Sequence, residues 1–439
     1  MSQKGKPMNK IRSVAVALAC VGALTMAACT PGEKPTTQTT NSDPRSGPQE
    51  LTYLYFTDGP DEQATRDLIA KFEKEKNVKV TLEIVPFANL EQTLQARLSG
   101  GNAPDVARLS ALTNFKTDLL DLNTYQKDNL DGKFIDGFDR ATKGDKGERL
   151  AVPSDLTING PFVNVDQFKK AGVEVPTKEK PWKSWQEMVD AAKKVKEANK
   201  TEYSVAMDVS GHRFSTMLSQ YGTNLIGADG KSVGMDEAKT TQMISDFAKW
   251  NNDGTMPKDL TLQAGSKYKA ANEVFLAQQV PVYLSGNWQV AAFDKNAKFG
   301  WQAVPNPCQA RCGGYPGGKF MAGFKKSKNP ALAAEFIAWM NSAENQKQMD
   351  AGANFLPTRK DLVDTTIEYK TRKQDMEVFK AEIKNTPEDT YAGAYAPAFS
   401  NAAKAFVSEI SNVLAGKQQP AEATSKIKAA TEKAIKDAG

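Results

Sequence analysis

Strand-like and helix-like segments alternate in a fixed order where the regularly patterned part of the chain begins. Short apolar runs at residues 51–56, 78–86 and 104–109 predict three strands. Apolar residues at helical spacing fill the two intervals between these runs and predict a helix in each. The order β-α-β-α-β needs crossover helices and therefore predicts a parallel sheet, whose ligands bind beyond the carboxyl ends of the strands. The sequence thus predicts an α/β fold with a site at that edge.

The rest of the chain is predicted to be mostly helical. Four extended segments interrupt it, at residues 150–165, 280–284, 299–304 and 319–324. Helices are predicted at residues 60–76, 90–98, 185–198, 212–221, 236–252, 268–278 and 330–341. The tail over residues 397–438 predicts two helices that are broken near Gly416 and Pro420.

The N-terminal segment has the layout of a secretory signal peptide over residues 1–28. Four basic residues end at Arg12, and an apolar run from Val14 to Ala28 follows. This run is shorter than the roughly 20 residues that a membrane-spanning helix needs. The sequence Leu24-Thr25-Met26-Ala27-Ala28-Cys29 resembles a bacterial lipobox, which predicts Cys29 as a lipidated N-terminus. An ordinary signal peptide that contains a cysteine is the alternative.

Residues 29–49 are rich in Thr, Pro, Ser, Gly and Asn, with almost no apolar side chains. Such a segment cannot join a core, so it predicts a disordered tether between a lipid anchor and a folded part. The expected location is the outer face of the cell membrane, and a Gram-positive surface and a periplasm are both left open.

The overall charge of +5 comes mainly from the leader. Its four basic residues leave 53 of the 57 Lys and Arg residues against 52 Asp and Glu. A charge this close to zero gives no argument for nucleic acid as a partner. About 390 residues follow the tether, which is enough for two substantial lobes.

Cys308 and Cys312 are the two cysteines outside the leader and lipobox. In an exported chain they are expected to bond to each other and to shape a five-residue turn, with a gain of roughly 2 kcal/mol. A metal site is the alternative, but two thiols without neighbouring ligands argue against it. We expect neither a metal nor a cofactor.

The sequence lacks the motifs of the common enzyme classes. A single histidine excludes zinc centres of the HExxH type, and neither a G-x-S-x-G elbow nor a phosphate-binding P-loop occurs. The 52 acidic residues leave a glycosidase pair of carboxylates open. We expect a protein that is not an enzyme.

Five short motifs follow one another along the chain. They are Gly101-Asn102-Ala103-Pro104-Asp105-Val106, Val152-Pro153 with Phe162-Val163-Asn164, Ser285-Gly286-Asn287-Trp288, Gly317-Gly318-Lys319-Phe320 with Ala333-Ala334-Glu335-Phe336, and Asn354-Phe355-Leu356-Pro357-Thr358-Arg359. In this order, behind a lipobox, they resemble family 1 extracellular solute-binding proteins, the sugar-binding group that includes maltose-binding proteins. The resemblance extends over roughly residues 50–436.

This resemblance implies a two-lobe, periplasmic-binding-protein-like fold of type II, with a hinge of about three chain crossings. Lobe one would comprise residues 50–155 and 303–356, and lobe two residues 156–302 and 357–439. The implied function is capture of a mono- or oligosaccharide by hinge closure and its delivery to the permease subunits of an ABC transporter. A monomer is expected.

Two other kinds of function remain open. A receptor for glycerol 3-phosphate or a glycerophosphodiester would use Arg213 as its anion ligand. A cell-surface lectin or a glycoside hydrolase would work without a transporter.

A sugar site needs aromatic platforms and side chains that form paired hydrogen bonds. The resemblance implies that Trp288 stacks on the sugar, with a buried tryptophan as the alternative. Asn287 could reach a hydroxyl or cap the next helix. Asp155 matches a hinge-proximal position that accepts hydroxyl bonds in the family, whereas Asp105 in the first motif is expected to be a structural hydrogen-bonding residue. Leu109 stands where maltose-type relatives can carry a stacking tryptophan, which speaks against a long maltodextrin.

Further candidates follow predicted strands or begin predicted helices. Each has a structural alternative: a turn for Asp58, a helix cap for Ser110, the core for Phe87, and the surface for the helix start at residues 212–214. Tyr315 lies in a glycine-rich loop whose backbone could approach a ligand or merely turn. The complete set of further candidates is Asp58, Phe87, Ser110, His212, Arg213, Phe214, Tyr315, Tyr391 and Tyr395.

Overall fold

The computed structural model describes residues 49–57, 60–262 and 270–438. The predicted signal peptide, the lipidation site Cys29, nearly all of the tether and the candidate Asp58 lie outside these residues. Residues 45–439 form one compact unit. No helix within the described ranges is both long and apolar enough to cross a membrane.

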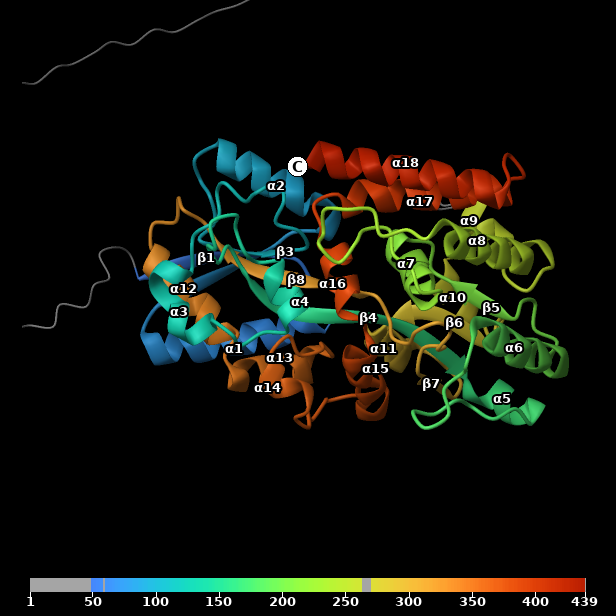
Figure 1. Cartoon of the computed structure of the whole chain (residues 1–439). Coiled ribbons are helices and arrows are strands. Elements are labelled where there is room, and N and C mark those ends of the chain that lie inside the picture. Colours follow the sequence, from blue (N-terminus) through green and yellow to red (C-terminus); the bar gives the residue numbers. More distant parts are fainter. Residues whose placement is uncertain (1–48, 58–59, 263–269, 439) are drawn as a thin grey trace, which may run out of the picture. The chain divides into compact units, whose positions relative to one another are not determined.

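The described residues contain eight strands and eighteen helices (Figure 1). The strands are β1 (Glu50–Tyr55), β2 (Lys79–Ile84), β3 (Val106–Leu109), β4 (Val152–Asn164), β5 (Val205–Met207), β6 (Val282–Gly286), β7 (Trp301–Ala303) and β8 (Pro316–Gly323). The helices are α1 (Asp61–Lys76), α2 (Phe87–Ser99), α3 (Asn123–Leu130), α4 (Asp136–Arg140), α5 (Val165–Ala171), α6 (Trp185–Asn199), α7 (Gly211–Gln220), α8 (Glu237–Asn252), α9 (Lys258–Leu262), α10 (Ala271–Leu276), α11 (Gln289–Asn296), α12 (Pro330–Met340), α13 (Ala343–Ala353), α14 (Lys360–Val363), α15 (Lys373–Asn385), α16 (Glu388–Ala394), α17 (Phe399–Leu414) and α18 (Pro420–Ala438).

The strands form one mixed sheet in the order β2-β1-β3-β8-β4-β6-β5, and β7 pairs with β4. β1 pairs in parallel with both β2 and β3, which confirms the parallel sheet predicted from the first five elements. β8 then runs antiparallel to β3 and β4. The predicted α/β class is therefore confirmed, and the carboxyl ends of β1, β2 and β3 lie at one edge.

The long strand β4 connects the two halves of the sheet. Its first part pairs with β8, and its second part pairs with β6 and β7. β8 begins at Pro316 rather than at the predicted Lys319, so part of the predicted glycine-rich loop is strand. Gly318 has a φ of 149°, and a Cβ there would lie 2.3 Å from the carbonyl oxygen of Asp155. Glycine thus permits the close approach of β8 to β4.

The described residues form three apolar clusters, two of which include opposite ends of β4, at Val152 and Val163. One contains Leu68 and Phe72 of α1 together with Phe336 of α12. The ring centroids of Phe72 and Phe336 lie 4.9 Å apart. Another contains Trp185 and Trp250, stacked at 6.1 Å, together with residues of α7, α17 and α18. Each cluster follows from the apolar stripe of an amphipathic helix. The third cluster, which includes Phe56, Phe138, Phe320 and Tyr391, lies among the elements that form the site described below.

Asp105 is a structural residue, as predicted. Its Oδ2 accepts hydrogen bonds from the backbone N–H and hydroxyl of Thr52, at 2.8 and 2.9 Å, and its Oδ1 accepts one from Ser327 at 2.5 Å. These bonds fix the start of β3 against β1.

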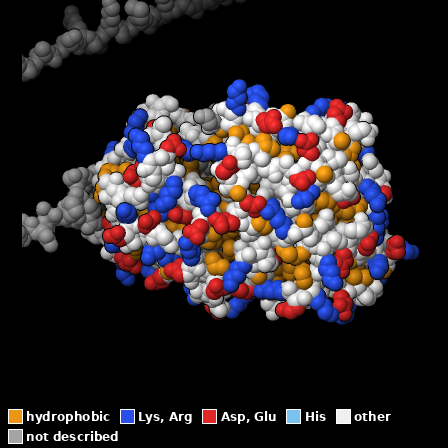
Figure 2. Space-filling model, in the orientation of Figure 1, with side chains coloured by type: hydrophobic (Ala, Val, Ile, Leu, Met, Phe, Trp, Pro, Cys, Tyr) orange, Lys and Arg blue, Asp and Glu red, His pale blue; other side chains and the backbone are white. Residues whose placement is uncertain are grey.

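The predicted pair of C-terminal helices is confirmed. α17 and α18 lie side by side and pack on α8 (Figure 1). The break falls at Gly416, whose φ of 72° suits glycine, and Pro420 begins α18. On the face drawn in Figure 2, Lys and Arg side chains are interspersed with Asp and Glu side chains, as a nearly balanced charge leads one to expect.

Candidate functional site

A cleft of about 1540 Å³ lies at the carboxyl ends of β2 and β3. Its walls come from the first turn of α2, the turn after β3, α4, the middle of β4, the first turn of α7, β8, α16 and α17. The position is the one that the parallel order of the first strands predicts.

Two predicted residues mark the rim beyond β2 and β3. Phe87 is 57% exposed and its ring lies 4.9 Å from that of Phe56. It begins α2, three residues earlier than the predicted helix, directly after Pro86, whose φ of −58° and ψ of 139° are not helical. Ser110 is exposed and caps no helix, since the chain continues from it into a turn. Both residues line the cleft.

Trp288 also lines the cleft, directly after β6. Its indole edge lies over Gly286, where a Cβ would come within 2.1 Å of the ring. The guanidinium carbon of Arg213 lies 4.6 Å from the ring centroid. The indole is therefore held between backbone and a cation in one orientation, which is what a stacking platform requires.

Arg213 is only loosely held by its polar neighbours. It contacts Asp208 and Asn159 at 3.4 Å each, and its Nε has no hydrogen-bond partner among the described residues. Asp208 is engaged more closely by the hydroxyls of Tyr283 and Ser285, at 2.7 and 2.6 Å. This Nε is buried, so the donors that Arg213 can offer to a ligand in the cleft are its two Nη atoms, whose present contacts are long.

His212 lies in the first turn of α7, next to Arg213, and is half-buried. Its ring contacts those of Phe399 and Tyr315, at centroid distances of 4.9 and 6.0 Å. Burial lowers the pKa of His212 to about 4, and the charges of Arg213 and Lys319 act in the same direction. The imidazole is therefore neutral near pH 7.

Tyr391 and Tyr395 line the cleft from α16 and its C-terminal end. The Tyr395 ring stacks on Phe138 of α4 at 4.7 Å, with an interplanar angle of 5°. Neither tyrosine hydroxyl has a hydrogen-bond partner among the described residues. Burial raises the pKa of both phenols above the usual value, so both remain protonated donors.

Asp155 lies beneath the cleft and does not line it. It is 1% exposed, and its Oδ2 accepts from Nε and Nη2 of Arg108 at 3.2 and 3.0 Å. Arg108 also donates to the carbonyl oxygen of Phe56 at 2.8 Å. The pair joins β4 to β3 and β1, so its geometry suits a role in fixing the sheet under the site.

Three other candidates are also buried. The amide of Asn287 accepts from the backbone N–H of Ile158 at 3.0 Å and donates to the carbonyl of Asn354 at 3.3 Å, so it links β4 to that loop and caps no helix. Phe214 packs in the core against Phe247 and Phe406. Tyr315 is 2% exposed and supports the cleft wall by stacking on Phe399.

Several lining residues were not singled out from the sequence. Thr157 and Asn159 project from β4, and their spacing of two along a strand is the signal that could have identified them. Lys319 and Phe320 belong to a motif that carried the family resemblance, although no binding role was assigned to them. Phe399 starts α17, and no local pattern indicates its position.

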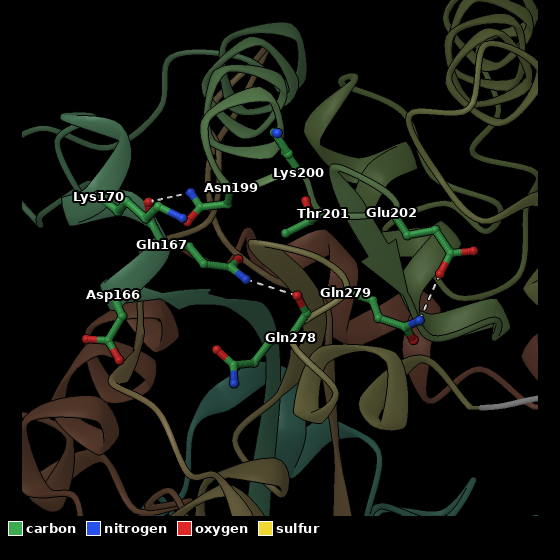
Figure 3. Close-up of a pocket in the computed structure, with 9 residues that line it drawn as sticks. All are labelled: Asp166, Gln167, Lys170, Asn199, Lys200, Thr201, Glu202, Gln278 and Gln279. Atoms are coloured by element: carbon green, nitrogen blue, oxygen red, sulfur yellow. Dashed lines mark hydrogen bonds between the residues drawn. The ribbon is translucent and has the colours of Figure 1, made fainter.

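A second pocket of about 470 Å³ lies between α5, the turn after α6 and the turn before β6 (Figure 3). Its nine lining side chains are all polar or charged, and several bond to one another. Gln167 donates to the carbonyl of Gln278 at 2.9 Å, and Gln279 donates to Glu202 at 2.8 Å. This pocket has no aromatic platform, so we place the candidate site in the cleft.

The described residues contain no group of three or more His, Cys, Asp or Glu side chains that could hold a metal ion. Cys308 and Cys312 are joined by a disulfide.

Two curated proteins resemble this chain along most of its length. A putative ABC transporter periplasmic-binding protein, YcjN of Escherichia coli, is 26% identical over 72% of this chain and 73% of its own. A galactooligosaccharide-binding protein of Bacillus subtilis is 23% identical over 81% of this chain and 82% of its own.

Solved structures share the fold. A cyclic alpha-maltosyl-1,6-maltose binding protein from Arthrobacter globiformis superposes with a TM-score of 0.74 at 18% identity, over 89% of this chain and all of its own. The ABC substrate-binding protein Lmo0181 from Listeria monocytogenes, in complex with cycloalternan, gives 0.72 at 20% identity, over 88% of this chain and 98% of its own. These comparisons confirm the predicted solute-binding fold.

A family match decides the relationship that the motifs predicted. Residues 57–347, more than half of the chain, match the family described as bacterial extracellular solute-binding protein. The protein belongs to the bacterial extracellular solute-binding protein family.

Proposed function

We propose that this protein captures a carbohydrate between two lobes and delivers it to the permease subunits of an ABC transporter. The observation that carries the proposal is the cleft, where the aromatic side chains of Phe87, Trp288 and Tyr395 lie beside the hydrogen-bonding groups of Arg213 and Asn159. Flat apolar rings and fixed polar groups are what a sugar needs. The oligosaccharide-binding proteins among its relatives support the same ligand class.

The size of the cleft favours an oligosaccharide over a single sugar. Its volume of about 1540 Å³ exceeds the roughly 300–1,000 Å³ that is usual for small-molecule pockets. Several sugar rings can therefore be held between Phe87 on one side and Trp288 on the other.

The mechanism is hinge closure without chemical change to the ligand. We propose residues 50–155 and 303–356 as lobe one and residues 156–302 and 357–439 as lobe two, so that β4 begins in one and continues in the other. A ligand that contacts both lobes stabilises the closed form, whose surface the permease then recognises. A lipid on Cys29 with a tether over residues 29–49 would keep the receptor near its transporter.

The test is a thermal-shift screen of residues 45–439, which form one compact unit. It would include mono- and oligosaccharides, N-acetyl sugars and glycerol phosphates. A bound ligand raises the melting temperature by mass action. The proposal stands if one sugar class produces a shift that Trp288→Ala removes and Tyr125→Ala, at an exposed ring outside the cleft, retains. No shift with any sugar would refute it.

A second candidate, an anionic ligand such as a glycerol phosphate, is favoured by one property of the lining. Among the described lining residues the cations are Lys116, Arg140, Lys143, Arg213, Lys231, Lys319 and Lys404, and the carboxylates are Asp145 and Asp229. Neutral sugar hydroxyls need acceptors as well as donors, whereas phosphates and carboxylates only accept. A shift with glycerol phosphates alone would favour this candidate.

Two further measurements distinguish a receptor from other classes. Hydrolysis of an oligosaccharide by the protein would identify a glycoside hydrolase. A lectin would bind sugar without closing, so an unchanged radius of gyration on binding would favour that class.

A further inference from the structure

The disulfide loop at residues 308–312 lies against elements that build the cleft. The backbone N–H of Cys308 donates to the carbonyl of Trp182 at 2.8 Å, and that of Ala310 donates to the carbonyl of Gln220 at 2.8 Å. The side chain of Gln220 donates in turn to the carbonyl of Gly313 at 2.8 Å. The loop is thus fastened at its start to Trp182, ahead of α6, and at its middle and far end to Gln220 at the C-terminal end of α7.

Arg311 projects from this loop and bonds to two helices at once. Its Nε donates to the carbonyl of Ser219, near the C-terminus of α7, at 2.7 Å. Its Nη1 donates to both carboxylate oxygens of Asp389 on α16, at 2.7 and 3.0 Å. The first bond places a cation where the α7 dipole is negative, and the second has the geometry of a strong charge-assisted pair.

Asn224 closes this group into a ring of contacts. Its Oδ1 accepts from Nη2 of Arg311 at 3.0 Å, and its Nδ2 donates to Asp389 at 2.8 Å. The Arg311 and Asp389 side chains are only 25% and 31% exposed. Each member therefore orients the other two, which makes the group more rigid than an isolated surface pair.

Both helices that Arg311 joins carry cleft residues. The first turn of α7 carries His212 and Arg213, and α16 carries Tyr391, with Tyr395 at its end. Tyr391 packs closely against α4, because a Cβ on Gly137 of that helix would lie 2.6 Å from the Tyr391 side chain. A shift of α16 relative to α7 would therefore change the lining of the cleft directly.

We propose that Arg311 is a positioning residue for the ligand cleft: anchored by the Cys308–Cys312 loop, it fixes α16 against α7 through Asp389 and thereby sets where Tyr391 and Tyr395 meet the ligand. Arg311 itself is not among the residues that line the cleft. The link to ligand affinity rests on the proposed function, whereas the positioning of α16 can be measured without any ligand.

The experiment is hydrogen–deuterium exchange of the full chain without sugar. It compares wild type with Arg311→Gln, Arg311→Lys and Asp389→Asn. Glu388→Gln is the matched control, because Glu388 is the neighbouring residue on α16 and its 2.7 Å ion pair with Arg140 is exposed. Amides of residues 388–395 should exchange about tenfold faster in Arg311→Gln and Asp389→Asn. The exchange rate in Arg311→Lys should be intermediate, since lysine keeps the positive charge but lacks the planar guanidinium with its several donors.

The same experiment separates positioning from a loss of global stability. Amides of α1 should keep their wild-type exchange rates, whereas global destabilisation would raise them together with those of α16. The positioning role is overturned if residues 388–395 exchange at the wild-type rate in Arg311→Gln, or if Glu388→Gln speeds them equally.

Ligand affinity is the second readout, with maltotetraose and a galactotetraose as probes. Arg311→Gln should weaken binding of whichever probe wild type binds by about tenfold or more, and Lys193→Gln, at an exposed pair outside the cleft, should not. Unchanged affinity in Arg311→Gln would refute the link to the cleft. If wild type binds neither probe, the carbohydrate function loses support, and the exchange data still decide whether Arg311 positions α16.

Discussion

The guanidinium of Arg213 lies over the indole of Trp288, with its central carbon 4.6 Å from the ring centroid. Arg213 comes from the first turn of α7 and Trp288 from the residue pair after β6. Their contact orients the indole, and the two Nη atoms of Arg213 make only long contacts of 3.4 Å to Asn159 and Asp208. Because both residues line the cleft, an aromatic platform and a hydrogen-bond donor lie side by side there.

Gly286→Ala should displace the platform without removing it. The new Cβ would lie 2.1 Å from the indole, so the ring must leave its place on Arg213. We expect affinity for the bound sugar to fall by about tenfold to a hundredfold, as the loss of a stacking contact would cause. Isothermal titration calorimetry measures this, and an unfolding curve checks that the variant folds. An unchanged affinity would show that the indole position is unimportant.

Asp155→Asn should destabilise the fold. The substitution removes the nearer of two buried carboxylates that pair with Arg108, a residue that is 1% exposed, and Asp61 at 3.5 Å remains. Loss of one member of a buried pair typically lowers the free energy of unfolding by about 3–5 kcal/mol, and because Asp61 remains we expect a loss toward the lower end of this range. Urea unfolding gives the value, with Lys193→Gln as the control, because its pair with Asp253 is exposed and should contribute less than about 1 kcal/mol. If Asp155→Asn lowers the free energy of unfolding no more than Lys193→Gln does, the role of Asp155 in fixing the sheet would be contradicted.

His212→Gln should reduce the acid sensitivity of stability. The folded pKa of His212 is about 4 and its ordinary value is 6.5. Between these values, falling pH protonates the unfolded chain but not the folded one. The free energy of unfolding therefore decreases as the pH is lowered from 6.5 to 4, by up to about 1.4 kcal/mol per pH unit from this group. Above pH 6.5 the contribution of His212 to the free energy of unfolding is constant.

Urea unfolding between pH 4 and 8 measures this effect as the difference between His212→Gln and wild type. The difference should change below pH 6.5 and stay flat above it. Parallel curves over the whole range would mean that His212 titrates alike in both states.

Replacing both Cys308 and Cys312 by serine should have a modest global effect and a clear local one. A loop this short constrains the unfolded chain little, so the free energy of unfolding should fall by only about 2 kcal/mol. Exchange of residues 388–395 should rise, because Arg311 would lose its rigid base. If these amides exchange as in wild type, the disulfide is not needed to hold Arg311.

Regular local patterns made the start of the fold predictable. Apolar runs and helical spacing between residues 51 and 109 were enough to predict β1, α1, β2, α2 and β3 and the parallel sheet they form. Shorter elements such as α4 and α16 were not predicted, since five or seven residues span at most about two helical turns, which is too few to show a repeating apolar pattern. They are held by contacts from elsewhere, such as the stacking of Phe138 on Tyr395.

The sequence indicated which residues are candidates for binding, but it did not indicate which of them are exposed to the cleft. Phe87, Ser110, Arg213 and Trp288 line the cleft, and their positions follow strand ends or a helix start. Asp155 occupies an equally suggestive position and is buried. The difference arises because Arg108, 47 residues away in the sequence, bonds to it.

The sequence by itself determined the α/β pattern, the order of the first elements and the family, because these depend on neighbouring residues and on short motifs. Only the tertiary structure decided which side chains share the cleft and which are buried beneath it. The sheet places β8 beside both β3 and β4, and the Cys308–Cys312 loop reaches α7 and α16 through Arg311. Such contacts join residues far apart in the chain, so their energy depends on the packing of the whole fold and not on any local pattern.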